Sequence, residues 1–373
     1  MKGNITKRGK NSWRLKFDAG RDEKGERKTQ FVTFRGTKRE AQVELAKLIA
    51  SVAEQKYVEP HKITVAEWVR GRVDHWEASG EISARTAQRY RQLVENQIAP
   101  HIGAKLLQKL RTIDIETWHT TLRTSGRVRG KGEISARTIG HAHRVLGKAT
   151  RDAVKNELVL KNVVALESAP KVDDGEMEIV QDVPAFVAKV RGHRLFAMGM
   201  IGLFTGMRLG EVLALRWGRV DLDGKVIQVR EALEATKAHG IRFKVPKSKA
   251  GRRDLTLPDI LVDALRDFRR EQLELRLKLG SGKLPDDGLL FPNIEGEPRS
   301  PSSASRAWGD ATGVGYHALR HTHASQLIHA DVDIVTISKR LGHASPAITL
   351  AVYAHMFKKT DAKAAAAINA AMG

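Results

Sequence analysis

Residues 316–355 read YHALRHTHASQLIHADVDIVTISKRLGHASPAITLAVYAH. This stretch carries side chains that can bind an anion, move a proton or attack an electrophile, namely His317, Arg320, His343 and Tyr353. His317 and Arg320 are three residues apart, so they share one face if this part of the chain is a helix. Gly342 and Pro346 then interrupt the helical pattern, which predicts that the tyrosine lies on a further short helix.

The same stretch also allows a metal site, because His317 and His321 are four residues apart and His323 follows closely. Zinc sites combine such histidines with cysteine or with an acidic residue. The chain contains no Cys, and these histidines are not part of a His-Glu-x-x-His motif. Each residue taken alone could also be an ordinary side chain of a surface helix. The sequence therefore favours a site without metal or cofactor, and the residues gain meaning only as a set.

Two upstream motifs extend this set. Arg208 lies in TGMRLGE, where an apolar run ends at a Thr-Gly pair and a new helix is expected to begin. A helix N-terminus there would offer an anion backbone donors beside the guanidinium. Lys249 lies in PKSKAGRR, in the turn between strand patterns at 241–246 and 252–257. Lys247, two residues away, is the alternative lysine of this turn.

In this order the motifs resemble the tyrosine recombinase family, the phage-type integrases. The family has an arginine with an acidic residue beside it, a lysine on a β-hairpin, a His-x-x-Arg box, a further histidine and a nucleophilic tyrosine. The matching positions, called here the catalytic set, are Arg208, Glu211, Lys249, His317, Arg320, His343 and Tyr353. The spacings also resemble the family, with 343 − 320 = 23 from the box arginine to the second histidine and 353 − 343 = 10 from there to the tyrosine.

The resemblance implies phosphoryl transfer on DNA without a metal ion. Arg208 and Arg320 would bind the non-bridging phosphate oxygens and stabilise the charge of the transition state, with His343 as a further donor. These arginines would do the electrostatic work that a divalent ion does elsewhere. Glu211 would orient a basic residue of the site.

The resemblance also gives the direction of the chemistry. Tyr353 would attack phosphorus to form a 3′-phosphotyrosyl link, with His317 as the candidate base. Lys249 would protonate the leaving 5′-oxygen. Since the link stores the energy of the broken bond, a second DNA strand can reverse the step without ATP. The implied function is integration or excision of a phage or other mobile element. A transposon recombinase, a resolvase of the same chemistry and a catalytically silent DNA-binding regulator are the alternatives.

The composition of the chain agrees with a nucleic-acid partner. Its 373 residues carry 64 Lys and Arg against 43 Asp and Glu, a formal net charge of +21. The apolar run at 195–207 is too short to span a bilayer, and the basic N-terminus lacks the apolar core of a signal peptide. Absence of Cys fits a reducing compartment. We therefore expect no membrane association and a place on the nucleoid in the cytoplasm of a bacterial host.

Residues 1–60 are expected to form an arm-type DNA-binding domain. Alternating segments at 13–18 and 29–34 flank a turn, which predicts a hairpin or a three-stranded sheet. Thr37 and Glu40 form a capping-box pattern in front of an amphipathic helix. A small basic sheet with one helix resembles the module at the start of many integrases, and such a sheet can read the major groove.

Residues 61–168 are helical by pattern. The heptapeptide GEISART occurs at 80–86 and again at 132–138, each time before a helical pattern, so Ser83 and Ser135 are candidate N-caps. The resemblance implies that this region is a helical, SAM-like core-binding domain. Its exposed basic residues would contact phosphates and supply affinity more than sequence readout.

Residues 169–177 are polar with Gly and Pro close by, as in a linker, and residues 178–373 would be the catalytic domain, with a further strand pattern at 225–230. The predicted fold class is mainly α with small β-sheets, α+β, in a multidomain chain whose catalytic domain is mostly helical with a small antiparallel sheet. The resemblance implies a homotetramer on double-stranded DNA with core and arm sites. An excision factor and a host DNA-bending protein are possible further partners.

Overall fold

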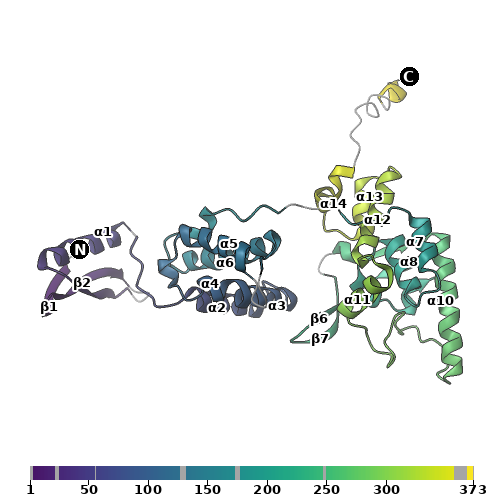
Figure 1. Cartoon of the computed structure of the whole chain (residues 1–373), viewed down its shortest axis with the longest axis horizontal. Helices are drawn as coiled ribbons and strands as arrows, with labels where there is room; N and C mark the ends of the chain where they lie inside the picture. The colour runs from purple at the N-terminus through teal and green to yellow at the C-terminus, as the bar shows by residue number, and fades with distance from the viewer. Residues whose placement is uncertain are drawn as a thin grey trace. The chain divides into compact units, whose positions relative to one another are not determined.

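The computed structural model describes residues 3–21, 25–54, 56–126, 132–172, 177–246, 249–356 and 368–372. The chain forms two compact units, Met1–Asp173 and Asp174–Gly373, and Figure 1 labels most of their helices and some of their strands. Helices dominate, and the sheets are small and antiparallel, so the predicted α+β class is confirmed. None of the helices in the described ranges combines the length and the apolar character that crossing a bilayer requires.

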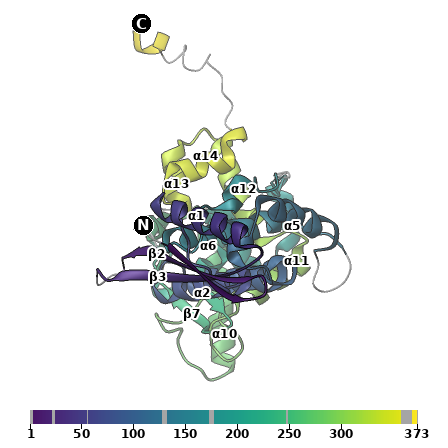
Figure 2. The same ribbon diagram turned by 90° about the vertical axis from the view of Figure 1, so that its left-hand side faces the viewer.

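The first unit begins with a three-stranded antiparallel sheet in the order β1-β2-β3. Its strands are β1 (Gly3–Gly9), β2 (Ser12–Arg21) and β3 (Arg27–Arg35). Helix α1 (Lys38–Ala53) covers one face of the sheet, where Leu15 and Phe17 are buried with Leu45 (Figures 1 and 2). The predicted capping box is present: Thr37 Oγ1 accepts from the Glu40 backbone N–H at 3.3 Å, and the Glu40 carboxylate accepts from the Thr37 backbone N–H at 2.8 Å.

The helical part of the first unit packs around two tryptophans. Its elements are α2 (Val65–Ala78), α3 (Ala84–Leu93), the π-helical turn η1 (Val94–Ile98), α4 (Ala99–Ile102), the 3-10 turn η2 (Leu107–Lys109), α5 (Thr112–Ser125), α6 (Ala136–Lys155) and η3 (Val163–Leu166). Trp76 and Trp118 are fully buried. Their indole N–H groups donate to Asp152 at 2.8 Å and to the carbonyl of Gln97 at 2.7 Å, so burial leaves neither donor unpaired.

The repeated heptapeptide forms the same helix start twice. Ser83 caps α3 and Ser135 caps α6, as the sequence predicts. Each serine Oγ accepts from the backbone N–H three residues later, from Thr86 at 3.4 Å and from Thr138 at 3.3 Å. Each serine also pairs with that threonine's hydroxyl at 3.0 Å. The repeat is therefore a local capping solution.

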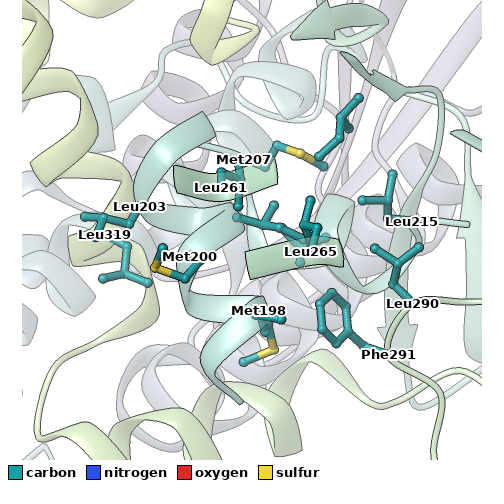
Figure 3. Close-up of a cluster of buried hydrophobic side chains, with 14 of the residues drawn as sticks. Met198, Met200, Leu203, Met207, Leu215, Leu261, Leu265, Leu290, Phe291 and Leu319 are labelled. Atoms are coloured by element: carbon teal, nitrogen blue, oxygen red, sulfur yellow. The ribbon is translucent and has the colours of Figure 1, made fainter. Parts of the chain in front are cut away.

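Helix α8 lies at the centre of the second unit. The helices are α7 (Val183–Val190), α8 (Phe196–Thr205), α9 (Leu209–Leu213), α10 (Asp259–Lys278), α11 (Pro301–Thr312), α12 (Tyr316–His329), α13 (Ile334–Leu341) and α14 (Pro346–Tyr353), with 3-10 turns η4 (Trp217–Arg219) and η6 (Ala354–Met356). Figure 3 shows Met198, Met200 and Leu203 of α8 in one buried cluster with Leu261 and Leu265 of α10 and Leu319 of α12. Gly202 has no side chain because a Cβ there would lie 2.6 Å from the Tyr316 hydroxyl.

Two small antiparallel sheets complete the second unit. One contains β4 (Val220–Asp221), β5 (Val226–Val229) and β8 (Arg253–Thr256) in that order, and the other is a hairpin of β6 (Ala232–Thr236) and β7 (Gly240–Lys244). The three predicted strands are confirmed. However, β7 pairs with β6, a strand that the sequence did not predict because its residues, ALEAT, have a weak preference for strands. Lys249 therefore lies in the turn η5 (Lys249–Gly251) that connects two sheets, not between two paired strands.

Candidate active site

Arg208 stands at the N-terminus of α9, at the turn that the Thr-Gly pair predicts. Gly206 ends α8 with a left-handed backbone (φ 66°), a conformation that glycine adopts at little cost. The Glu211 carboxylate accepts a hydrogen bond from the Arg208 backbone N–H and another from its Nη1, both at 3.0 Å. Glu211 therefore holds both the backbone and the guanidinium of Arg208 in place.

The second partner of Glu211 is Arg253 on β8, a residue that the sequence reasoning did not single out. Arg253 is buried, and its Nη2 donates to Glu211 at 2.8 Å while its Nε donates to the Arg340 carbonyl at 2.7 Å. Burial by itself would raise the pKa of the Glu211 carboxyl, but Arg253 and then Arg208 hold that pKa below its usual value. The period-two pattern of β8, which puts Arg253 on the face of the leucines that follow, is the signal that could have found it.

Arg320 on α12 is a buried cation with an unused donor. Arg320 is 3% exposed, and its Nη1 donates to the Gly206 carbonyl at 2.6 Å. Its Nη2 has no hydrogen-bond partner among the described residues. Burial, and then the charge of Arg208, lower the pKa of Arg320 to about 9. A buried N–H beside a second guanidinium is a site for an anionic oxygen, because leaving it unpaired is costly.

His343 follows Gly342, which ends α13 in a left-handed conformation. The His343 backbone N–H donates to the Ser338 carbonyl at 3.0 Å, and its Nδ1 is hydrogen-bonded to Thr349 Oγ1 at 2.7 Å. Burial, and then the charge of Arg320, lower the pKa of His343 to about 4, so the ring is neutral near pH 7. With Nδ1 engaged by the threonine, Nε2 is the nitrogen available to a substrate.

Tyr353 ends α14 and is almost fully buried. Burial raises the pKa of its phenol to about 12, against the opposing charge of Arg320. Its Oη is hydrogen-bonded to Nδ1 of His321 at 2.8 Å. His317, the base suggested by the family resemblance, instead meets the His321 ring edge-on, with 4.6 Å between ring centroids. In this state of the protein the histidine in contact with Tyr353 is therefore His321.

One cavity brings together segments that are far apart in the sequence. Its volume is about 560 Å³, and its lining includes Arg208, Glu211, Lys244, Gly251 and His343. Burial, then Arg320 and Arg208, lower the pKa of His317, so α9 and α12 place these groups within electrostatic reach of one another. Three members of the catalytic set, Arg208, Glu211 and His343, therefore line this cavity, and the charges of Arg208 and Tyr353 act on Arg320 nearby.

The lysine of the set is the least constrained position. Lys249 precedes the Gly251 wall of the cavity by two residues, and no described contact joins its side chain to the other members of the set. Lys247, its alternative, lies outside the described residues. Lys244 on β7 lines the cavity, and its ammonium pairs with the buried carboxylate of Glu234 at 3.0 Å.

Of the three histidines considered for zinc, His317 and His321 are in edge-on ring contact, whereas His323 has other partners. His323 uses both ring nitrogens: Nδ1 is bonded to a carbonyl of α8 at 3.0 Å, and Nε2 accepts from Arg340 Nε at 3.0 Å. His321 faces Tyr353, as described above. Within the described ranges, no group of three or more His, Asp or Glu side chains is arranged to hold a metal ion.

Two family models match the chain. The model of the phage integrase family matches residues 178–360, and the model of the phage integrase N-terminal SAM-like domain matches residues 72–123. The chain is 25% identical over 396 residues to the protein named "Tyrosine recombinase XerC-like" of Caldanaerobacter subterraneus subsp. tengcongensis, covering 99% of this chain and 98% of that protein.

Solved structures of similar fold include two integrases bound to DNA. The integrase of transposon Tn1549 in complex with a circular intermediate DNA has a TM-score of 0.68 and 19% identity, with 83% of this chain and 100% of that chain covered. A lambda integrase tetramer bound to a Holliday junction has a TM-score of 0.51 and 18% identity, with 92% and 96% covered.

The residues matched by the first family model, 178–360, include every member of the catalytic set. The second model falls on the helical region from α2 to α5. The sequence match, the fold and the arrangement of the arginines and the tyrosine therefore agree, and the chain belongs to the phage integrase family of tyrosine recombinases, enzymes that break and rejoin DNA strands at specific sites.

Proposed function

We propose that the chain is the integrase of a mobile element and that it cuts and rejoins DNA through a 3′-phosphotyrosyl intermediate on Tyr353. The observation that carries the proposal is the buried Nη2 of Arg320, which has no hydrogen-bond partner among the described residues. The positive charge of Arg208 acts on the same guanidinium and lowers its pKa. Two guanidiniums with directed donors suit the two non-bridging oxygens of a phosphodiester. The bound phosphate would supply the acceptor that Arg320 lacks.

In the proposed cleavage step the Oη–P bond forms and the P–O5′ bond breaks. Arg208 and Arg320 bind the phosphate oxygens throughout, and His343 adds a donor as charge grows on them. The phenol proton of Tyr353 leaves during the attack, with His317 as the proposed base. Lys249 is proposed to donate a proton to O5′. The reverse sequence, with the 5′-hydroxyl of another strand as nucleophile, rejoins the DNA.

The regions of the chain are proposed to contact different parts of the DNA. The assignments are arm-type sites for residues 1–60, core-type sites for residues 61–168, a linker at 169–177 and catalysis for residues 178–373. The sheet face opposite α1 supports the first assignment. There the Arg14 guanidinium lies 4.1 Å from the centre of the Phe31 ring, and Phe31 is 49% exposed. A basic face with an exposed aromatic ring fits a DNA groove.

The active assembly is proposed to be a homotetramer on DNA in the bacterial cytoplasm, with an excision factor and a host DNA-bending protein as further partners. The similarity to a lambda integrase tetramer on a Holliday junction supports this arrangement. The element could be a phage or a transposon, since the family model is named for phages and one solved relative comes from a transposon. A resolvase of the same chemistry and a silent DNA-binding regulator are the alternatives. The regulator is disfavoured because binding alone needs no buried tyrosine.

The test is covalent trapping on a nicked attachment site without divalent metal. Wild type should give a band on a denaturing gel in which protein is attached to the 3′ end of the DNA, and Tyr353→Phe should bind DNA equally but give no such band. Strand exchange between two labelled duplexes would then separate a recombinase from a topoisomerase of similar chemistry. Retardation on a native gel without any covalent band would favour the regulator.

A further inference from the structure

The hydroxyl of the proposed nucleophile is held by a residue outside the catalytic set. His321 lies on α12 directly after Arg320, and its Nδ1 is 2.8 Å from Tyr353 Oη, across 32 residues of sequence. The two rings meet at an angle of 61°, with 5.8 Å between their centroids. The contact joins the helix that carries the phosphate-binding arginine to the helix that ends at the nucleophile.

Both partners of this hydrogen bond are neutral near pH 7. The Tyr353 phenol is neutral at pH 7, because burial raises its pKa to about 12. Burial, then His317 and Arg320, lower the pKa of His321 to about 4, so the imidazole is neutral too. A neutral imidazole can accept at one nitrogen, and a phenol has a single O–H to donate. With the His321 proton on Nε2, Tyr353 O–H donates to His321 Nδ1.

Both side chains have little freedom to leave this arrangement. Tyr353 is 1% exposed and packs in a buried cluster with Ile337 and Leu341. The His321 ring contacts the ring of His317 edge-on as well as that of Tyr353. Because the tyrosine ring is fixed by packing, the remaining freedom of its hydroxyl is rotation about the Cζ–Oη bond. The acceptor at Nδ1 removes that rotation.

We infer that His321 is a positioning residue for strand cleavage: by accepting the Tyr353 O–H it fixes which way the oxygen lone pairs point when a phosphate occupies the arginine site. The inference rests on the proposed function. Its place beside Arg320 gives it a second consequence, since one turn of α12 then sets the positions of the phosphate and of the attacking oxygen together. A hydroxyl aimed before the substrate arrives lowers the ordering cost of the attack.

The test compares two replacements of His321 with a control on the same helix. In His321→Asn the Oδ1 atom takes the place of the Nδ1 acceptor, whereas His321→Leu keeps the volume and loses the acceptor. His329→Leu, at the exposed end of α12, is the control. In single-turnover formation of the covalent complex, His321→Leu should be slower by about tenfold, the worth of one hydrogen bond. The Asn variant and the control should stay within about threefold of wild type, with DNA retardation unchanged in all three.

A second substrate separates the nucleophile from the leaving group. With sulfur in place of the bridging 5′-oxygen, the leaving group needs no proton. The defect of Lys249→Ala should then largely disappear, while the defect of His321→Leu should persist, because it concerns the attacking oxygen. A Leu variant as fast as wild type, an Asn variant as slow as the Leu variant, or sulfur rescue of the Leu variant would each overturn the inference and leave the proposed function intact. Absence of a covalent complex from wild type would reject both.

Discussion

Glu211 is a carboxylate buried between two arginines whose exposure is unequal. The side chain of Arg208 is 43% exposed and that of Arg253 is 7% exposed. Water can take part in solvating Arg208 but not Arg253, so the inner pair is the one that keeps the carboxylate charged inside the protein. This division leaves the outer arginine able to turn its guanidinium toward a phosphate while Glu211 still has a partner.

Replacing the buried Arg253 should therefore lower the free energy of unfolding more than replacing its exposed neighbour Arg252. In Arg253→Met the Glu211 carboxylate would keep only a half-exposed partner, and we expect the free energy of unfolding to fall by about 3 kcal/mol. Arg252→Met, one residue away and exposed, is the matched control and should change it by less than about 0.5 kcal/mol. Urea denaturation followed by circular dichroism measures both, and equal losses would show that the buried pair has no special role.

A buried histidine pair makes the first unit sensitive to acid. His119 Nε2 and His143 Nδ1 are 3.1 Å apart, and burial, then the charge of His143, lower the pKa of His119 to about 4. The charge of Arg123 lowers the pKa of His119 further. Burial also lowers the pKa of His143, where the charge of Glu167 acts to raise it and the charge of Arg144 to lower it. An unfolded histidine has a pKa of about 6.5, so as the pH falls the unfolded chain takes up protons first.

The contribution of this pair to the free energy of unfolding should consequently be greatest, and constant, above about pH 7. It should decrease as the pH falls from about 6.5 to 4. His119→Phe removes one of the titrating groups. The difference between the urea midpoints of wild type and variant should be constant above about pH 7 and should shift in favour of the variant below that. A difference that does not depend on pH over this window would contradict the assignment.

Which residues could be found from the sequence depends on where their partners lie. Arg208, Arg320 and Tyr353 were predicted as site residues because their types, order and spacing resemble those of the tyrosine recombinase family. Arg253 and His321 were not, since their roles come from partners 42 and 32 residues away, and neither residue differs locally from an ordinary arginine or histidine. Of the residues that hold the proposed catalytic groups in place, the sequence indicated Glu211 and missed Arg253 and His321.

At the scale of secondary-structure elements, the sequence predicted those features that depend on interactions between residues close together in the chain. Helix starts at Thr37, Ser83 and Ser135 follow from side chains that bond three residues ahead. The pairing of β7 with β6 did not follow, because strand partners are selected by tertiary packing and β6 has weak intrinsic preference for a strand. For the same reason the sequence predicted that Lys249 lies in a hairpin turn, whereas in the structure it lies in a connection between two sheets.

The packing of α8 against α11 gives an element-scale prediction with an internal control. A Cβ at Gly199 of α8 would overlap the ring of Trp308, whereas a Cβ at Gly309, the next residue on α11, would meet nothing within 4 Å. Gly199→Ala should therefore destabilise the protein by about 2 kcal/mol through overpacking. Gly309→Ala should stabilise it by about 0.5–1 kcal/mol through helix propensity. Thermal unfolding compares the two, and the same sign for both would refute close packing at Gly199.

For the molecule as a whole, the two proposed binding surfaces lie on two units, and this placement has a kinetic consequence. The basic sheet face belongs to the first unit, and the cavity lined by Arg208 and His343 belongs to the second. If the first binds arm sites, its binding raises the effective concentration of the catalytic unit near the core site without changing the chemistry there. Loss of arm binding should then reduce recombination of full attachment sites and spare cleavage of an isolated core site.

The sheet face can be tested without removing any part of the chain. Arg14 and Lys16 lie side by side on β2 with Phe31 opposite Lys16 on β3, on the face away from the buried Leu15. The double variant Arg14→Gln, Lys16→Gln should weaken binding to arm-site duplexes. It should also reduce the salt dependence of that binding by about two phosphate contacts, a change of roughly 1.8 in the slope of log K against log salt.

Lys38→Gln with Arg39→Gln, on the exposed first turn of α1, removes the same charge from the covered side of the sheet and is the control. Titrations at several salt concentrations on arm-site and core-site duplexes measure both variants. A loss confined to the first variant and to arm sites locates the interface on the open sheet face, because net charge is the same in the two proteins. Equal losses would mean that the first sixty residues attract DNA only through their overall charge, and the arm-binding proposal would fall while the catalytic one stood.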